Sequence, residues 1–276
     1  MSATMRQLAI LGRDRLKDDD VVPGSLGSLE IEGVRVRAAL LEVPAPAFDP
    51  DDPANADMVL LGVRAFSLNY RDRGLILRAA LSARTRGYYV VGSEFVAEVL
   101  AFGSAVRDLA PGNRVIPDGA FPSSGVDGLP GGLPTNHGSR GRLVVHRRKL
   151  MPIPASIPDE VAAALTIGAQ TAYAMVRRLS LVAGERVVLT APTSNTSLFA
   201  LSLLRMRGIE ACGIGTSAGH RDGLLSAGMH DLLVVDPRER SFALSGSIRA
   251  FVEENGPFAA MIDPLSDVYL PLAPHL

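Results

Sequence analysis

The sequence has 276 residues, with 28 basic and 29 acidic side chains and a net charge of −1. Its apolar content of 47% supports a sizeable core, so we predict a globular protein of about two domains and exclude a disordered chain. The charge gives no electrostatic reason to expect a nucleic acid partner. The single cysteine, Cys212, excludes an intrachain disulfide framework and a thiolate zinc cluster.

No targeting or membrane segment is predicted. The N-terminus lacks the apolar stretch of a secretory signal, and no segment approaches the roughly 20 apolar residues that span a bilayer. We therefore expect a soluble cytoplasmic protein in a reducing setting that does not contact a membrane.

The N-terminal half is predicted to consist of strands and irregular connections. Val34–Val43 alternates apolar residues with Arg and Glu, as a half-buried strand does. Met58–Ala65 and Val90–Leu100 are two further expected strands, and Pro117–Gly141 is a long loop rich in proline and glycine. After Pro158, two acidic residues begin a helical region that we expect to continue through the apolar run Val161–Leu181 as one buried helix or two.

From Arg186 onward, strands and helices alternate. The expected strands are Arg186–Thr190, Glu210–Ile214, Leu232–Val235 and Phe258–Ile262, and the expected helices between them are Ser197–Arg207, His220–Ala227 and Ser241–Asn255. A glycine follows each helix. Such alternation predicts parallel strands joined by right-handed crossovers.

Four segments in the same order resemble one known family. They are Val63–Asp72 (VRAFSLNYRD), Gly92–Val99 (GSEFVAEV), Ala110–Val115 (APGNRV) and Pro154–Tyr173. Together they are similar to the zinc-free quinone-reductase and enoyl-reductase branch of the medium-chain dehydrogenase/reductase superfamily. The resemblance implies an α/β protein with a GroES-like β-rich substrate domain over residues 1–154 and a Rossmann-type dinucleotide domain over 155–276.

The sequence departs from this family in two respects. Zinc-dependent relatives use a cysteine near Ser67–Tyr70 and a histidine in a Gly-His-Glu triplet, which here reads Gly92-Ser93-Glu94. Catalytic zinc needs about three protein ligands, so we expect no metal. The family also continues past the fourth strand with two more strands and a return into the first domain, whereas this sequence ends at Leu276. We expect either a sheet truncated after the fourth strand or an incomplete sequence. Relatives dimerise through those last strands, so a homodimer is implied only by resemblance.

The turn after the first parallel strand contains no glycine. In the family its glycines allow a tight turn and close approach to the pyrophosphate, whereas residues 191–197 read Ala-Pro-Thr-Ser-Asn-Thr-Ser. Either these side chains donate hydrogen bonds to phosphate at the helix N-terminus, or they fill its place, or they merely cap the helix. The candidate cofactor-binding residues in this turn are Thr193, Ser194, Asn195, Thr196 and Ser197.

The end of the second parallel strand favours NADP(H) over NAD(H). No carboxylate for the ribose hydroxyls follows Gly215. Thr216 lies at this end as a candidate cofactor residue, and Arg221 is a candidate for the 2′-phosphate or else an exposed helix arginine. Thr171 matches a residue that touches the nicotinamide in relatives, or is an ordinary helix threonine.

The resemblance implies that Asn69 and Tyr70 lie near the nicotinamide and substrate. A phenol or an amide there would hydrogen-bond the developing enolate oxygen; alternatively, Tyr70 packs and Asn69 closes a turn. Two hypotheses therefore stand. The first is a zinc-independent NADP(H)-dependent oxidoreductase that reduces an activated C=C or C=O group of a quinone, enone or enoyl-type substrate. The second is a non-redox binding protein, or a repurposed enzyme, that has lost the dinucleotide.

Overall fold

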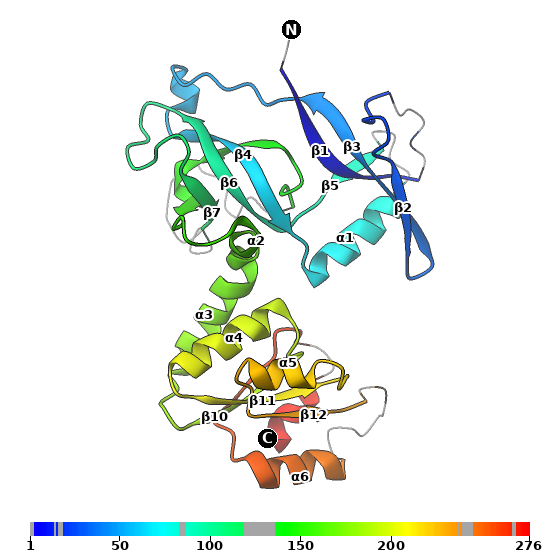
Figure 1. Ribbon diagram of the computed structural model, residues 1–276, viewed down its shortest axis with the longest axis vertical. Helices are drawn as coiled ribbons and strands as arrows, with labels where there is room; N and C mark the ends of the chain where they lie inside the picture. Colours follow the sequence, from blue (N-terminus) through cyan, green and yellow to red (C-terminus); the bar gives the residue numbers. More distant parts are fainter. Residues whose placement is uncertain are drawn as a thin grey trace. The chain divides into compact units, whose positions relative to one another are not determined.

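The computed structural model describes residues 3–13, 15, 19–82, 87–118, 136–236, 238, 245–266 and 269–276. The chain divides into two compact units, Met1–Ile167 and Gly168–Leu276. The first is rich in antiparallel strands and the second contains a parallel sheet covered by helices (Figure 1). The predicted α/β architecture is confirmed. No helix in the described ranges is long and apolar enough to cross a lipid bilayer.

The first unit contains two antiparallel sheets. The sheet with the order β2-β3-β1-β5 comprises β1 (Thr4–Leu11), β2 (Gly27–Ile31), β3 (Val34–Pro44) and β5 (Tyr88–Val90). The sheet with the order β8-β4-β6-β7-β9 comprises β4 (Met58–Ser67), β6 (Glu94–Phe102), β7 (Arg114–Pro117), β8 (Arg142–His146) and β9 (Leu150–Pro152). The helical elements are η1 (Pro53–Asn55), α1 (Tyr70–Leu81), η2 (Arg147–Lys149), α2 (Asp159–Ala162) and the π-helix η3 (Leu165–Ala169), which carries the boundary between the units. Most of the expected Pro117–Gly141 loop lies outside the described residues.

The prediction of one strand over Val90–Leu100 is wrong. The segment splits into β5, which pairs with β1, and β6, which pairs with β4. Gly92 between them has φ of +93°, and a Cβ there would lie 2.7 Å from the ring of Phe66. The positive φ turns the chain from one sheet to the other, which apolar periodicity does not reveal.

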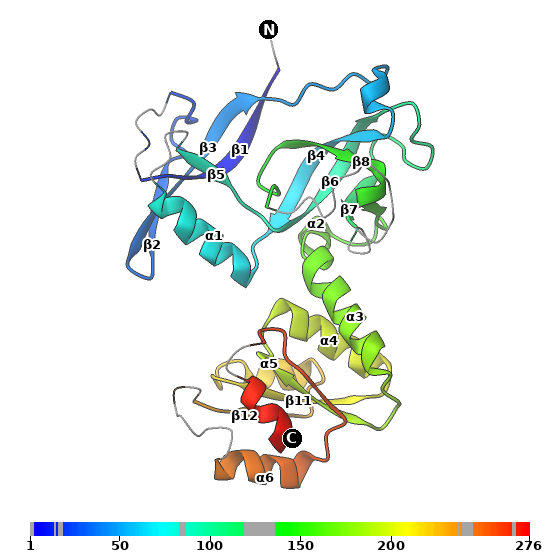
Figure 2. The ribbon, with the colours of Figure 1, turned by 180° about the vertical axis from the view of Figure 1, so that it is seen from behind.

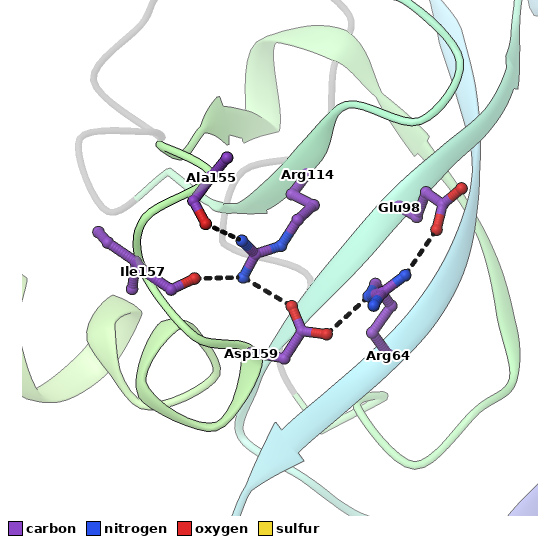
Figure 3. A network of polar contacts seen from close by, with 6 residues as sticks. All are labelled: Arg64, Glu98, Arg114, Ala155, Ile157 and Asp159. Carbon is purple, nitrogen blue, oxygen red and sulfur yellow. Dashed lines mark hydrogen bonds and ion pairs between the residues drawn. The ribbon is translucent and has the colours of Figure 1, made fainter.

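A network of ion pairs fixes the segment that leads into α2 (Figure 3). Asp159 accepts a 2.6 Å hydrogen bond from Nε of Arg64, and its other oxygen lies 2.6 Å from Nη2 of Arg114. Arg64 also donates to Glu98 on β6, and Arg114 donates to the carbonyl of Ile157. The hydrogen bond from Arg64 holds the pKa of Asp159 below its usual range. The segment is thus tied to β4 and β7 directly, and to β6 only through Arg64.

In the second unit, four parallel strands have the order β12-β11-β10-β13. The strands are β10 (Arg186–Thr190), β11 (Glu210–Gly215), β12 (Asp231–Val234) and β13 (Ala260–Ile262), and the helices are α3 (Gln170–Leu179), α4 (Asn195–Met206), α5 (Arg221–Ser226), α6 (Gly246–Asn255) and η5 (Leu270–His275). All four predicted strands are confirmed to within two residues at either end. Of the predicted helix Ser241–Asn255, residues 241–244 lie outside the described residues.

Alternate side chains of the parallel strands enter two separate cores. Val187 and Leu189 of β10 pack with residues of α3, α4 and α5. Val188 lies between them in sequence and packs on the other face with residues of α6 and with Leu272 of η5. Helices cover both faces of the sheet, as Figures 1 and 2 show for α4 and α6. This is a doubly wound sheet.

The expectation of a buried helix or two over Val161–Leu181 is only partly met. The run is divided among α2, the π-helix and α3. In α3 only Ala172 and Val176 are buried, whereas Tyr173 is half exposed. The helix buries one side only, and the many apolar residues of the run obscured that one-sided pattern.

Candidate cofactor site

A cavity of about 260 Å³ lies at the carboxyl ends of the parallel strands. Residues that follow β10, β11 and β13 line it, namely Ala191, Pro192, Thr193, Gly215, Thr216, Ser217, His220, Leu265 and Tyr269. In open α/β sheets, ligands bind in this crevice outside the carboxyl ends of the strands. The turn without glycine therefore leaves open space beside it.

Two of the candidate cofactor-binding residues in the turn, Ser194 and Ser197, form the cap of helix α4. The hydroxyl of Ser194 accepts a 3.1 Å hydrogen bond from the N–H of Ser197 and donates to the Ser197 hydroxyl at 3.0 Å. Ser197 is fully buried, and its hydroxyl donates to the carbonyl of Thr190 at 2.9 Å. Neither serine lines the cavity. Their hydroxyls serve the helix start, the third alternative left open by the sequence.

The other residues of the turn take different places. Thr193 is exposed and lines the cavity. Asn195 packs against Gly168, where an added Cβ would lie 2.7 Å from Nδ2. Thr196 is half-buried in the first turn of α4, where helix N–H groups are available to an anion. Ala191 has φ of +43°, the left-handed conformation that glycine usually adopts, and holding alanine there costs about 1–2 kcal/mol.

Some of the residues that follow β11 line a cavity, and others do not. Thr216 lines both this cavity and a second one of about 510 Å³, which is also lined by Val234, Val235, Asp236 and Arg238. Arg221, the predicted partner of a 2′-phosphate, donates to the carbonyl of Leu232 at 2.6 Å and pairs with Asp231 at 2.7 Å. It lines neither cavity. His220 and Arg238 are the basic residues that do.

The segment after β13 completes the smaller cavity, although no motif or periodic pattern in the sequence indicates this. Asp263 accepts a hydrogen bond from the Thr190 hydroxyl at 2.6 Å and another from the N–H of Leu265 at 3.2 Å. These bonds hold Leu265 beside the end of β10. Tyr269 is buried and packs in the core beneath α6 while also lining the cavity. These contacts between distant segments have no periodic signature.

In the first unit, Asn69 and Tyr70 form the start of α1. Asn69 is the N-cap, and its Nδ2 donates to Glu94 Oε1 at 2.8 Å. Tyr70 is 75% exposed, and its hydroxyl accepts a 2.7 Å hydrogen bond from Arg73. The Tyr70 proton therefore remains available for donation. Thr171 belongs to the second unit, exposed in the first turn of α3.

The segment Ser67–Tyr70 and the triplet Gly92-Ser93-Glu94, where related enzymes carry zinc ligands, do not fit zinc. Ser67 and Asn69 each donate to Glu94 at 2.8 Å, and Ser93 donates to Asp72. Zinc in proteins is bound chiefly by thiolate, imidazole and carboxylate, whereas these side chains are hydroxyl and amide groups already bonded to carboxylates. Across the described ranges no cluster of three or more His, Cys, Asp or Glu side chains is arranged to hold a metal ion.

Comparison with known proteins finds a family match within the first unit. Residues 55–155 match the family of the alcohol dehydrogenase GroES-like domain. Erythronolide synthase EryA2 of Saccharopolyspora erythraea is 31% identical over 215 residues, which are 76% of this chain and 5% of that protein. Acryloyl-coenzyme A reductase of Metallosphaera sedula is 28% identical over 179 residues, which are 60% of this chain and 52% of the reductase.

Solved structures share the fold. The quinone oxidoreductase of Escherichia coli complexed with NADPH matches with a TM-score of 0.59 and 17% identity, over 91% of this chain and 62% of that one. The chain thus spans about half of the curated reductase and a small part of the synthase. The domain match over residues 55–155 and the shared fold agree with the resemblance carried by the four sequence segments.

Proposed function

We propose that the chain is a zinc-independent NADP(H)-dependent oxidoreductase of the medium-chain dehydrogenase/reductase superfamily that reduces an activated C=C or C=O group. The observation that carries this proposal is the open cavity beside the glycine-free turn. The hydroxyls of Ser194 and Ser197 are bonded to the start of helix α4 and to the Thr190 carbonyl. They therefore do not fill the cavity in which we place the phosphate.

The two cavities that meet at Thr216 suit the adenosine half of a dinucleotide. Phosphate would lie against Thr193 and the N-terminal turn of α4, where the helix dipole favours an anion. The ribose would lie beside Thr216 and Ser217, and the adenine in the larger cavity beside Val235. The preference for a 2′-phosphate rests on His220 and Arg238, because Arg221 is engaged by Asp231.

On the substrate side, Tyr70 is the hydrogen-bond donor. When bound, a reduced nicotinamide would supply the hydride that adds to the carbon of the activated double bond. As charge develops on the substrate oxygen, a positioned donor stabilises it. Tyr70 meets this need because Arg73 donates to its oxygen and leaves the phenol proton free. The Asn69 amide, in contrast, already donates to Glu94.

The relatives support this substrate class. Acryloyl-coenzyme A reductase is named for an unsaturated thioester, and the Escherichia coli structure is a quinone oxidoreductase with NADPH. Both substrates contain a C=C bond conjugated to a carbonyl, in which a hydrogen bond to oxygen assists hydride addition at carbon. We propose quinones, enones and enoyl thioesters as the acceptors to be tested.

A second candidate function is a non-redox protein that kept the scaffold. It is favoured by one observation: no glycine occurs among residues 191–197, and Ala191 takes the positive φ in its place. Such a protein would keep the capped helix and the cavity but bind no dinucleotide.

Oxidation of NADPH by quinones, enones and enoyl thioesters, followed at 340 nm, distinguishes the reductase from the non-redox protein. The reductase proposal predicts turnover that falls about 10-fold or more in Tyr70→Phe, from the loss of one transition-state hydrogen bond. Ser202→Ala is the matched control, since Ser202 is exposed and donates only within α4. Absence of turnover with every acceptor class, together with absence of NADPH binding, would establish the non-redox alternative.

A further inference from the structure

Three segments of the first unit converge on one buried carboxylate. Glu94, the first residue of β6, has no exposed surface. Its Oε1 accepts hydrogen bonds from the Ser67 hydroxyl and from Nδ2 of Asn69, both at 2.8 Å, and its Oε2 accepts the N–H of Ile167 at 2.6 Å. The donors come from the end of β4, the cap of α1 and the π-helix.

A second buried carboxylate holds the same cap from its backbone. Asp72 is fully buried, and its Oδ2 accepts the N–H of Asn69 at 2.7 Å as well as the Ser93 hydroxyl. Asn69 is therefore fixed twice: Asp72 holds its main chain and Glu94 holds its side chain. No ion pair within the described part of the chain involves either carboxylate.

Burying a carboxylate costs free energy that neutral donors only partly offset, whereas an apolar residue of similar size would fill the same space at less cost. Unlike an apolar residue, Glu94 accepts hydrogen bonds, which are directional. Its two oxygens fix the relative positions of Ser67, Asn69 and Ile167. Tyr70 follows Asn69 directly and projects into solvent.

We propose that Glu94 is a positioning residue of the reductase site, which sets the Asn69 cap so that the Tyr70 phenol meets the substrate oxygen. This inference rests on the proposed function, because it assigns Glu94 a role in the reaction through Tyr70. The hydrogen-bond partners of Glu94 all belong to the first unit, and none of them lines the cavity beside Thr216. We therefore expect a change at Glu94 to alter the reaction step and not the affinity for the cofactor.

A carboxylate is required because all three contacts are donated to it. In Glu94→Gln, which keeps the size of the side chain, the amide N–H₂ must face at least one N–H donor, either that of Ile167 or that of Asn69. The cap is then displaced. Displacement of a reacting group by about 1 Å costs up to about 100-fold in rate, so we expect kcat to fall between about 10- and 100-fold.

The experiment is a double-mutant cycle in the full chain with Glu94→Gln and Tyr70→Phe, measuring kcat, KM and the dissociation constant for NADPH. Glu94→Gln should lower kcat and leave NADPH affinity within about twofold. Tyr70→Phe should have little further effect in the Glu94→Gln background, because residues that act as one unit are not additive. Glu98→Gln, on the same strand and in a partly exposed ion pair, is the control that should keep kcat.

Independent, multiplicative losses from the two substitutions would overturn the inference while leaving the reductase function standing. If the wild-type chain neither binds NADPH nor reduces an acceptor, the proposed function fails and this inference fails with it. Should Glu94→Gln not fold, Asn69→Ala severs the same link from the other side. It is expected to show the same fall in kcat and the same non-additivity with Tyr70→Phe, and full additivity there contradicts the inference equally.

Discussion

Replacing Ser194 with alanine separates helix capping from phosphate binding in the glycine-free turn. The Ser194 hydroxyl accepts the N–H of Ser197 at 3.1 Å and donates to the Ser197 hydroxyl at 3.0 Å. Alanine leaves both groups of Ser197 without this partner. Ser197 is fully buried, so water replaces the lost bond only at the cost of a local opening.

The two roles predict effects of comparable size on different quantities. Loss of a serine N-cap costs about 0.5–2 kcal/mol, and the buried Ser197 N–H places the expected value in the upper half of that range, about 1–2 kcal/mol. For a domain of about 100 residues, such as the second unit Gly168–Leu276, each loss of 1 kcal/mol lowers the melting temperature by about 4–8 °C. A hydroxyl that bonds a charged phosphate contributes about 1.5–3 kcal/mol, or roughly 10- to 150-fold in affinity.

The assay is urea unfolding of the Ser194→Ala variant together with NADPH titration at a temperature where it is folded. We expect lower stability and a dissociation constant within about twofold of wild type. Ser245→Ala is the matched control, because Ser245 caps α6 in the same way through the N–H of Ile248 and lines neither cavity. Unchanged stability with a tenfold loss of NADPH affinity would refute the capping account.

Three further predictions concern stability and reactivity. Asp159→Asn should lower the unfolding free energy by about 0.5–1 kcal/mol at neutral pH. The hydrogen bond from Arg64 holds the pKa of Asp159 below its usual range, so in pH-dependent urea melts the difference from wild type should begin to shrink as pH falls below about 4 and should vanish below the lowered pKa of the folded state. Gly103→Ala should cost more than about 2 kcal/mol, because its Cβ would lie 1.8 Å from the Asn55 carbonyl; a wild-type melting temperature would contradict this. Burial raises the pKa of Cys212 to about 11, so Ellman's reagent at pH 8 should label it only upon unfolding, and rapid labelling of native protein would argue against the buried position.

The parallel sheet could be predicted almost to the residue because its signals are local. Short apolar runs such as Arg186–Thr190 are enclosed between helices that end at glycine, and each run is buried on both faces. The antiparallel unit was harder, since the break at Gly92 depends on a positive φ and on packing against Phe66. Neither the positive φ nor this packing changes the periodic pattern of apolar residues in the sequence.

The candidate site also contains residues whose place follows from local sequence and residues whose contacts depend on the tertiary structure. Thr193 and Thr216 follow parallel strands, so strand order alone places them at the cavity. The direction of a side chain within a turn is not local information, and Ser194 and Ser197 proved to cap α4. Arg221 is engaged by Asp231, ten positions later in the chain, and only tertiary structure reveals this partner.

The central claim is that the cavity beside the glycine-free turn binds NADPH, and titration of Thr216→Glu tests it most directly. Thr216 is exposed at the edge of both cavities, so the fold should tolerate the change, while a carboxylate there should repel the phosphates and weaken binding at least about tenfold. Thr216→Gln, of nearly the same size but neutral, should bind within a few-fold of wild type. NADPH binding by wild type that Thr216→Glu leaves unchanged, or no wild-type binding at millimolar NADPH, would contradict the account.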